Sequence, residues 1–166
     1  MSRIVLDSDG LIKLAKSGAL NMALEHFDCI ISQEVFSEVV IEGKARGFDD
    51  AYMVEGTIKT GKLKIKIYEQ DERANNLLMN ATGLGHGEIS SLHLFYSTRA
   101  KAIITDDQKF IKFLESEQLP VIVPASLIHK LQQLKKIDKE QALSSLQKIK
   151  TLIKNDTFEK IERKIK

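Results

Sequence analysis

Two adjacent carboxylates, Asp106 and Asp107, follow a short apolar run that ends in Thr105. The residues after them return to a helical pattern, so the two acids lie where a buried strand meets the start of a helix. In open α/β sheets this edge is where ligands bind. Neighbouring carboxylates repel each other unless a cation, a proton or a helix N-terminus offsets their charge. A role as helix N-cap explains one of the two acids and leaves the other available for chemistry.

Other acids occupy comparable places in the sequence. Asp7 follows an apolar run and precedes a helical segment, with Asp9 two residues later. Glu88 follows a glycine-rich loop and opens another helix, whereas Glu38 lies early in a helix of its own. No Arg or Lys close to these acids in the sequence is expected to compensate them. A cluster of such acids would need hard cations with oxygen ligands, Mg²⁺ or Mn²⁺, which stabilise charge on a phosphoryl group and activate water.

Strand and helix patterns alternate through residue 124. Five short runs predict strands, at residues 3–6, 28–31, 62–67, 101–105 and 120–124. The amphipathic segments between them predict helices. This alternation predicts an α/β fold of three α/β/α layers with a central parallel sheet of four to five strands. The carboxyl ends of parallel strands meet at one edge, so Asp7 and Asp107 converge if their strands are neighbours.

Length and composition limit the class of protein. A chain of 166 residues with 43% hydrophobic residues can bury one good core. The single cysteine, Cys29, excludes disulfides within the chain and Cys-rich zinc sites. No apolar stretch approaches the roughly 20 residues needed to span a bilayer, and the first residues contain no hydrophobic signal region. We therefore expect a cytoplasmic protein without a membrane segment.

Charge divides the chain into two parts. Residues 125–166 hold 11 of the 25 Lys and Arg and 5 of the 23 Asp and Glu, so their net charge is +6 and that of residues 1–124 is −4. From residue 125 onward only helical stripes occur, among them those around Leu127 and Leu143. We expect residues 1–124 to form the core domain, and 125–166 to form a basic helical extension that packs on the core or on a partner.

Four motifs in this order resemble the PIN-domain family, metal-dependent nucleases that include the toxins of the VapBC toxin–antitoxin systems. They are Val5-Leu6-Asp7-Ser8, Val35 to Val39 with Glu38, Gly85-His86-Gly87-Glu88, and Ile104-Thr105-Asp106-Asp107 with Phe110. The resemblance covers about residues 1–124. It departs from the family at Asp9, where a small polar residue is common, and in the longer C-terminal helices.

The resemblance implies a function and a set of site residues. The residues that match the family's acidic, metal-binding positions are Asp7, Glu38, Glu88 and Asp107, with Asp106 as an added or alternative ligand and Thr105 as the hydroxyl that orients the cluster. The implied reaction is hydrolysis of single-stranded RNA by a metal-activated water, with Mg²⁺ or Mn²⁺, leaving 5′-phosphate and 3′-hydroxyl ends. The family also implies a homodimer, with the stripes near Leu127 and Leu143 as contact surfaces, and an antitoxin protein as partner.

Two alternatives remain open from the sequence. The segment Asp7-Ser8-Asp9-Gly10-Leu11 is similar to the opening motif of haloacid-dehalogenase-like phosphatases, in which Asp7 would be the nucleophile and Asp9 a general acid. That interpretation leaves Glu38 and Glu88 without a role. The second alternative is a non-catalytic RNA-binding module on the same fold.

The two histidines closest to the acidic motifs have structural explanations. His86 has the spacing of half a zinc-deaminase signature, but the required Pro-Cys-x-x-Cys is absent, so we expect it to be a loop or cap residue. His93 is expected to be a half-buried side chain of the helix in which it lies.

Overall fold

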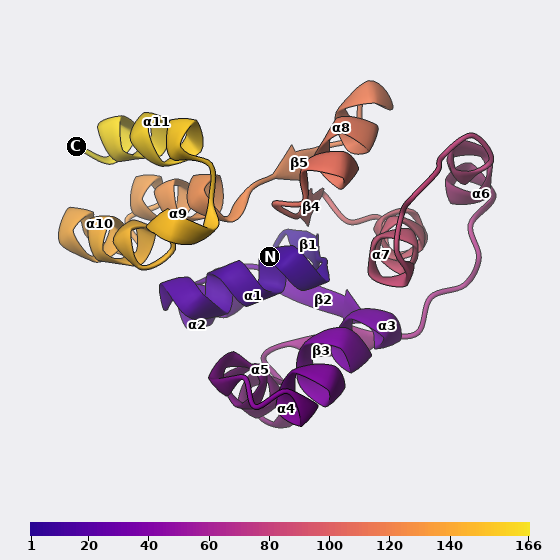
Figure 1. Cartoon of the computed structure of the whole chain (residues 1–166), viewed down its shortest axis with the longest axis horizontal. Coiled ribbons are helices and arrows are strands. Elements are labelled where there is room, and N and C mark those ends of the chain that lie inside the picture. Colours follow the sequence, from indigo (N-terminus) through magenta and orange to yellow (C-terminus); the bar gives the residue numbers. More distant parts are fainter.

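The computed structural model describes residues 1–166 and contains one parallel sheet with helices on both faces (Figure 1). The strands are β1 (Arg3–Leu6), β2 (Asp28–Ser32), β3 (Lys64–Lys66), β4 (Ala102–Ile104) and β5 (Val121–Ile122). Their order across the sheet is β3-β2-β1-β4-β5, and every pairing is parallel. The α/β fold predicted from the alternating patterns, with its central parallel sheet, is confirmed.

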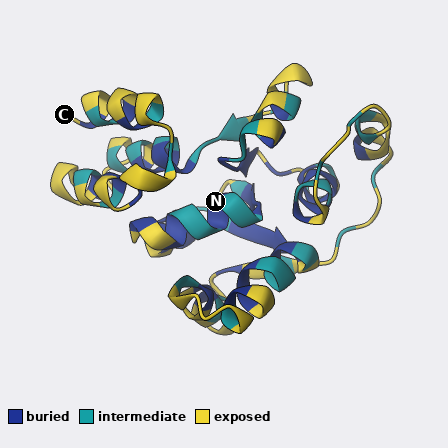
Figure 2. Ribbon diagram, viewed as in Figure 1, coloured by how far each residue is buried: buried dark blue, intermediate teal, exposed yellow.

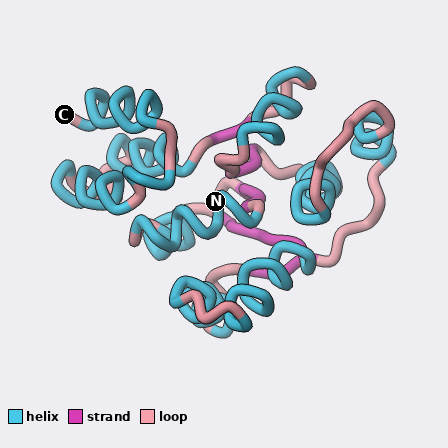
Figure 3. Tube along the Cα trace, viewed as in Figure 1, coloured by secondary structure: helices cyan, strands magenta, loops and turns pink.

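Helices make up most of the remaining chain (Figure 3). Between β1 and β3 they are α1 (Ser8–Ser17), α2 (Leu20–His26), α3 (Gln33–Phe36), the π-helical η1 (Ser37–Glu42), α4 (Gly43–Ala45) and α5 (Asp49–Lys59). Between β3 and β5 they are α6 (Glu72–Leu78), α7 (His86–Ser97) and α8 (Gln108–Ser116). After β5 they are α9 (Pro124–Gln133), α10 (Lys139–Lys148), the 3₁₀ turn η2 (Lys150–Leu152) and α11 (Asn155–Ile165).

The sheet separates two hydrophobic cores because successive side chains of a strand point to opposite faces. In β1, Ile4 and Leu6 belong to the larger core, which also contains residues of α1, α2 and α9 to α11. Val5 points to the other face and joins the smaller core, built from α6, α7 and α8. Burial on both faces explains the apolar runs 4–6 in β1 and 29–31 in β2 (Figure 2).

The C-terminal helices contribute to the larger of these two cores. Leu127 is 1% exposed, and Leu143 packs against the same cluster. The expectation that the stripes near these two residues form contacts between subunits is therefore wrong, because their apolar faces are already covered by α1, α2 and one another. An apolar stripe that is buried in the core of its own chain is not available for a contact with another subunit.

Three strands are shorter than their sequence patterns predict. β4 covers Ala102–Ile104 of the run 101–105, and β5 covers Val121–Ile122 of the run 120–124. β3 covers only Lys64–Lys66 of the alternating run 62–67, and Ile67 is 93% exposed. This strand lies at the edge of the sheet and pairs only with β2, so nothing on its outer side extends it. None of the helices is both long and apolar enough to cross a membrane.

Candidate active site

The site lies where the chain leaves β1 and β4. The sheet continues from β1 to β2 on one side and to β4 on the other, which makes this a topological switch point, the place where open α/β sheets bind ligands. Leu6 pairs in register with Ile104, and the backbone N–H of Asp7 donates to the Ile104 carbonyl at 3.2 Å. The residues that follow the two strands, Asp7 and Thr105, are therefore adjacent.

Asp7 is the most deeply buried carboxylate of the site, at 2% exposure. It is the N-cap of α1, and its Oδ1 accepts the backbone N–H of Gly10 at 2.7 Å. Its Oδ2 accepts a hydrogen bond from the Thr105 hydroxyl. Burial nevertheless raises the pKa of Asp7 to about 8, and the charges of Asp9 and Glu88 act in the same direction. A positive charge is needed to keep this carboxylate ionised at neutral pH.

Asp107 and Glu88 each combine a cap with a place at the site. Asp107 is the N-cap of α8, and its Oδ1 accepts the Phe110 N–H at 2.8 Å. Glu88 lies in the first turn of α7, where its Oε2 accepts the Gly85 N–H at 2.5 Å. Burial raises the pKa of Glu88, with further contributions from the carboxylates of Asp107 and Glu38. Each residue therefore stabilises the start of a helix and also places its carboxylate at the site.

Glu38 reaches the site from the π-helical segment η1, a type of helix that is rare and often found at functional sites. Its Oε2 accepts a hydrogen bond from the Ser8 hydroxyl. A Cβ atom at Gly87 would lie 3.0 and 3.1 Å from the two Glu38 carboxylate oxygens. Such contacts are tighter than a side chain normally allows, so glycine at position 87 lets α7 approach Glu38 closely.

These side chains line one polar cavity of about 150 Å³. Its lining contains no hydrophobic residue and consists of Asp7, Ser8, Asp9, Glu38, Gly85, Gly87, Glu88 and Asp107. Five of them are carboxylates, and carboxylate oxygens are the donors that Mg²⁺ and Mn²⁺ prefer. No three acidic, His or Cys side chains surround one point closely enough to hold a metal ion. Carboxylate oxygens of Asp7, Glu38 and Glu88 instead accept hydrogen bonds from neighbouring hydroxyl and N–H groups. The carboxylate oxygens are suitable ligands for a divalent cation. The charge of such a cation would also offset the cost of burying Asp7 as an anion.

Asp106 is placed differently from the other predicted ligands. It is 8% exposed, does not line the cavity, and forms a 2.6 Å ion pair with Lys13 Nζ. Lys13 also contacts Asp9, at 3.1 Å. The expectation that no Arg or Lys compensates the acids is thus wrong. Lys13 lies four residues after Asp9 on α1, and this helical spacing was the signal available in the sequence.

Four further residues that line the cavity were not predicted from the sequence as ligands of the PIN-type site. Ser8 stands next to an acid, and its bond to Glu38 depends on two helices that meet only in the fold. Asp9 lines the cavity with a side chain that is 39% exposed. Gly85 and Gly87 bring backbone close to the carboxylates.

His86 and His93 do not line the acidic cavity. His86 is the first residue of α7 and does not line the cavity. His93 is 3% exposed, its Nδ1 accepts the Asp71 N–H at 3.1 Å, and its ring stacks on Tyr68 with centroids 5.2 Å apart. Burial lowers the pKa of His93. Its surroundings are those of a structural side chain, buried more deeply than the sequence led us to expect.

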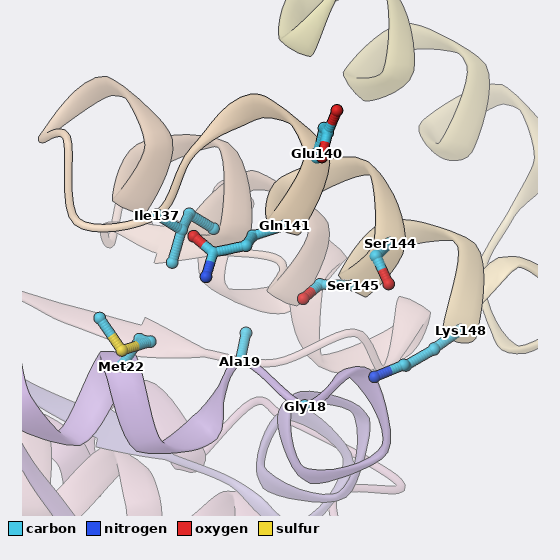
Figure 4. Close-up of a pocket in the computed structure, with 9 residues that line it drawn as sticks. All are labelled: Gly18, Ala19, Met22, Ile137, Glu140, Gln141, Ser144, Ser145 and Lys148. Carbon is cyan, nitrogen blue, oxygen red and sulfur yellow. The ribbon is translucent and has the colours of Figure 1, made fainter.

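A larger cavity of about 370 Å³ lies between the α1–α2 turn and α10 (Figure 4). Gln141 and Lys148 extend from α10 toward Ala19 and Gly18, while Glu140 points away from that turn. Only one carboxylate belongs to its lining, so it lacks the set of oxygen donors found at the ends of β1 and β4. The candidate active site is therefore the smaller, acidic cavity.

The chain was compared with protein families, curated proteins and solved structures. A family model described as a PIN domain matches residues 3–166, which includes the C-terminal helices. No curated protein and no solved structure matches the chain. PIN domains have a nuclease-type fold, are generally hydrolases that act on nucleic acid, and typically use divalent metals. On the family model, which covers nearly the whole chain, this protein belongs to the PIN-domain family.

Proposed function

We propose that the protein is a Mg²⁺- or Mn²⁺-dependent endoribonuclease that hydrolyses phosphodiester bonds of single-stranded RNA. The observation that carries the proposal is the cavity at the ends of β1 and β4, which is lined by five carboxylates and no hydrophobic residue. Family membership supports nuclease chemistry there. It favours a nuclease over the phosphatase alternative, which has no role for Glu38 and Glu88.

In this proposal four carboxylates hold the metal, those of Asp7, Glu38, Glu88 and Asp107. A bound divalent ion would stabilise charge on the phosphoryl group and lower the pKa of a water molecule. Asp7 would give up its proton when the ion binds, because its pKa lies near 8 in the protein alone.

Thr105 and Ser8 act as positioning residues in the same proposal. The Thr105 hydroxyl orients Asp7, and its oxygen accepts the Asp107 N–H at 3.2 Å. The Ser8 hydroxyl orients Glu38 in a comparable way. Asp106 is held by Lys13, which favours a support role over direct ligation. The products expected from this chemistry are 5′-phosphate and 3′-hydroxyl ends.

The first experiment is cleavage of an end-labelled single-stranded RNA with Mn²⁺, with Mg²⁺ and with EDTA. Parent protein is compared with Asp7→Asn and Asp107→Asn, and with Lys112→Gln as an exposed control on α8. Cleavage that requires metal and is lost in both Asp variants supports the proposal. RNA binding without cleavage by any form would favour the non-catalytic module. Hydrolysis of nitrophenyl phosphate that depends on Asp7 would favour the phosphatase.

A role as the toxin of a toxin–antitoxin pair, active as a homodimer, is a further proposal that rests on the family. The helices once expected at a subunit contact are internal, so any partner must use other surfaces. Apolar side chains exposed on η1, α5 and the residue before α5 are candidates, namely Ile41, Phe48, Tyr52 and Met53. Light scattering on the purified chain would give its oligomeric state, and the neighbouring gene would reveal an antitoxin.

A further inference from the structure

The acidic cavity presents an electrostatic problem for a polyanionic substrate. No Lys or Arg lines it. Lys13, which stands beside it, is occupied by Asp9 and Asp106. A metal ion can neutralise the phosphate that reacts, but the next phosphates of the strand would face uncompensated carboxylates. A nuclease with this cavity therefore needs a free cation at its rim.

Lys109 supplies such a cation. It is exposed in the first turn of α8, two residues after Asp107, and no carboxylate oxygen forms an ion pair with it. The Lys109 ammonium lies against Gly83, two residues before Gly85, which lines the cavity and donates its N–H to Glu88. The charge of Lys109 also partly counters the rise in the pKa of Glu88. The lysine is close to the acids and remains available to another anion.

The Lys109 side chain lies beside the loop that leads to α7. A Cβ atom at Gly83 would collide with Lys109 Nζ and would lie 3.4 Å from its Cε and 3.6 Å from its Cδ. Gly83 has a φ of +76°, in the region that favours glycine. The stem of the lysine thus lies across the bare Cα of Gly83.

We propose that Lys109 binds a phosphate of the RNA strand next to the bond that is cleaved, and thereby sets how the strand lies on the acidic cavity. This inference rests on the proposed ribonuclease function. The contact is a charge-assisted hydrogen bond between the ammonium and a phosphate oxygen. It recognises the backbone and no particular base. The absence of a Cβ at Gly83 leaves room for the lysine stem beside this loop.

Binding and cleavage are measured separately. Fluorescence anisotropy of a labelled single-stranded RNA is recorded with Mg²⁺ in an Asp107→Asn background, and cleavage kinetics in the parent background. Lys109→Gln and Lys109→Arg are compared with Lys112→Gln. Lys112 lies one turn further along α8, is equally exposed and forms no ion pair, so it reports the general effect of removing one charge.

Lys109→Gln is expected to weaken binding and raise KM about fivefold, the strength of one exposed charge pair, with kcat unchanged. The slope of log K against log salt concentration should fall by about 0.7, the value for one contact to a single-strand phosphate. Lys109→Arg should restore most of the affinity, because the charge is kept. Lys112→Gln should change each quantity much less.

Equal effects of Lys109→Gln and Lys112→Gln, or an unchanged salt slope, would overturn the role of Lys109. RNA binding that depends on Lys109 in a parent chain that does not cleave would keep this inference and refute the ribonuclease proposal. Thermal stability of each variant with and without Mn²⁺ shows that the fold and the metal site are intact. A chain that binds no RNA at all would refute both ideas.

Discussion

The Thr105 hydroxyl donates to Asp7 Oδ2, and Thr105 Oγ1 itself accepts the Asp107 backbone N–H at 3.2 Å. Thr105 is fully buried, at 0% exposure. One hydroxyl at the end of β4 therefore ties together the acid after β1 and the acid that caps α8. Asp7 and Asp107, two proposed metal ligands, are therefore held relative to each other by the ends of the paired strands β1 and β4.

Thr105→Val should disrupt this link without a change in side-chain shape. The loss leaves a buried oxygen of Asp7 without a donor, which costs about 1 to 3 kcal/mol of stability. Affinity for Mn²⁺ should fall about tenfold or more, as it does when residues that orient metal ligands are removed. Urea unfolding and calorimetric titration measure the two effects. Thr105→Ser keeps the hydroxyl and is the control; an equal loss in that variant would contradict a role for the hydrogen bond.

Asp106 and Asp107 should differ in function although they are adjacent. Asp107→Asn is expected to lower kcat/KM by about 100-fold or more, because it removes a group that acts in the transition state. Asp106→Asn should cost less than about tenfold, the lower end for a supporting group. Lys13→Met should destabilise the fold by about 3 kcal/mol, since it leaves Asp106 buried without its partner. Equal loss of activity in the two Asp variants would show that Asp106 is a ligand as well.

Stability of the metal-free protein should depend on pH through Asp7. Its folded pKa of about 8 lies above the ordinary value of 3.8, so the folded state holds this proton more tightly than the unfolded state does. The corresponding stability is complete below about pH 4 and is lost as pH rises toward 8, by at most about 1.4 kcal/mol per pH unit. Asp7→Asn should remove this loss.

Thermal unfolding in EDTA at pH 5, 7 and 9 tests this dependence. The difference between parent and Asp7→Asn isolates Asp7 from other titrating groups. Asp71, for example, has a pKa lowered to about 2 by Arg73, and its contribution is lost only as pH falls below about 4. Stabilisation by Mn²⁺ should grow as pH approaches 8, because the ion competes with a proton at Asp7. A parent and variant with parallel pH profiles would show that Asp7 is ionised throughout.

Gly10→Ala should destabilise the junction of α1 with β4. A Cβ atom at Gly10 would lie 2.7 Å from the backbone carbonyl carbon of Ile104, and even closer to its oxygen. The helix would have to move away from the strand, at a cost of about 1 to 3 kcal/mol. Gly56→Ala is the matched control, because nothing lies within 4 Å of a Cβ there and α5 continues on both sides. It should stabilise by about 0.5 to 1 kcal/mol, as measured by urea unfolding.

Much of the fold was predictable from the sequence because its signals are local. Buried strands of four or five residues, such as the segment Arg3–Leu6, are marked by continuous apolar runs. Helix starts are marked by capping residues such as Ser32, whose hydroxyl accepts the Val35 N–H. The alternating order of these patterns predicts parallel pairing. The edge strand β3 was overestimated because its length depends on a neighbour that pattern cannot reveal.

The sequence by itself determined which acids end strands or begin helices, and hence that Asp7 and Asp107 would converge if β1 and β4 were neighbours. Only the tertiary structure decided what each acid contacts. Asp106 and Lys13 are 93 residues apart in the chain, yet they form an ion pair in the fold. Asp106 is held by this pair, whereas its neighbour Asp107 lines the cavity. Whether the C-terminal stripes face a partner or the chain's own core was also settled by packing. Local patterns are set by neighbouring residues, whereas these contacts depend on how distant segments meet across the sheet.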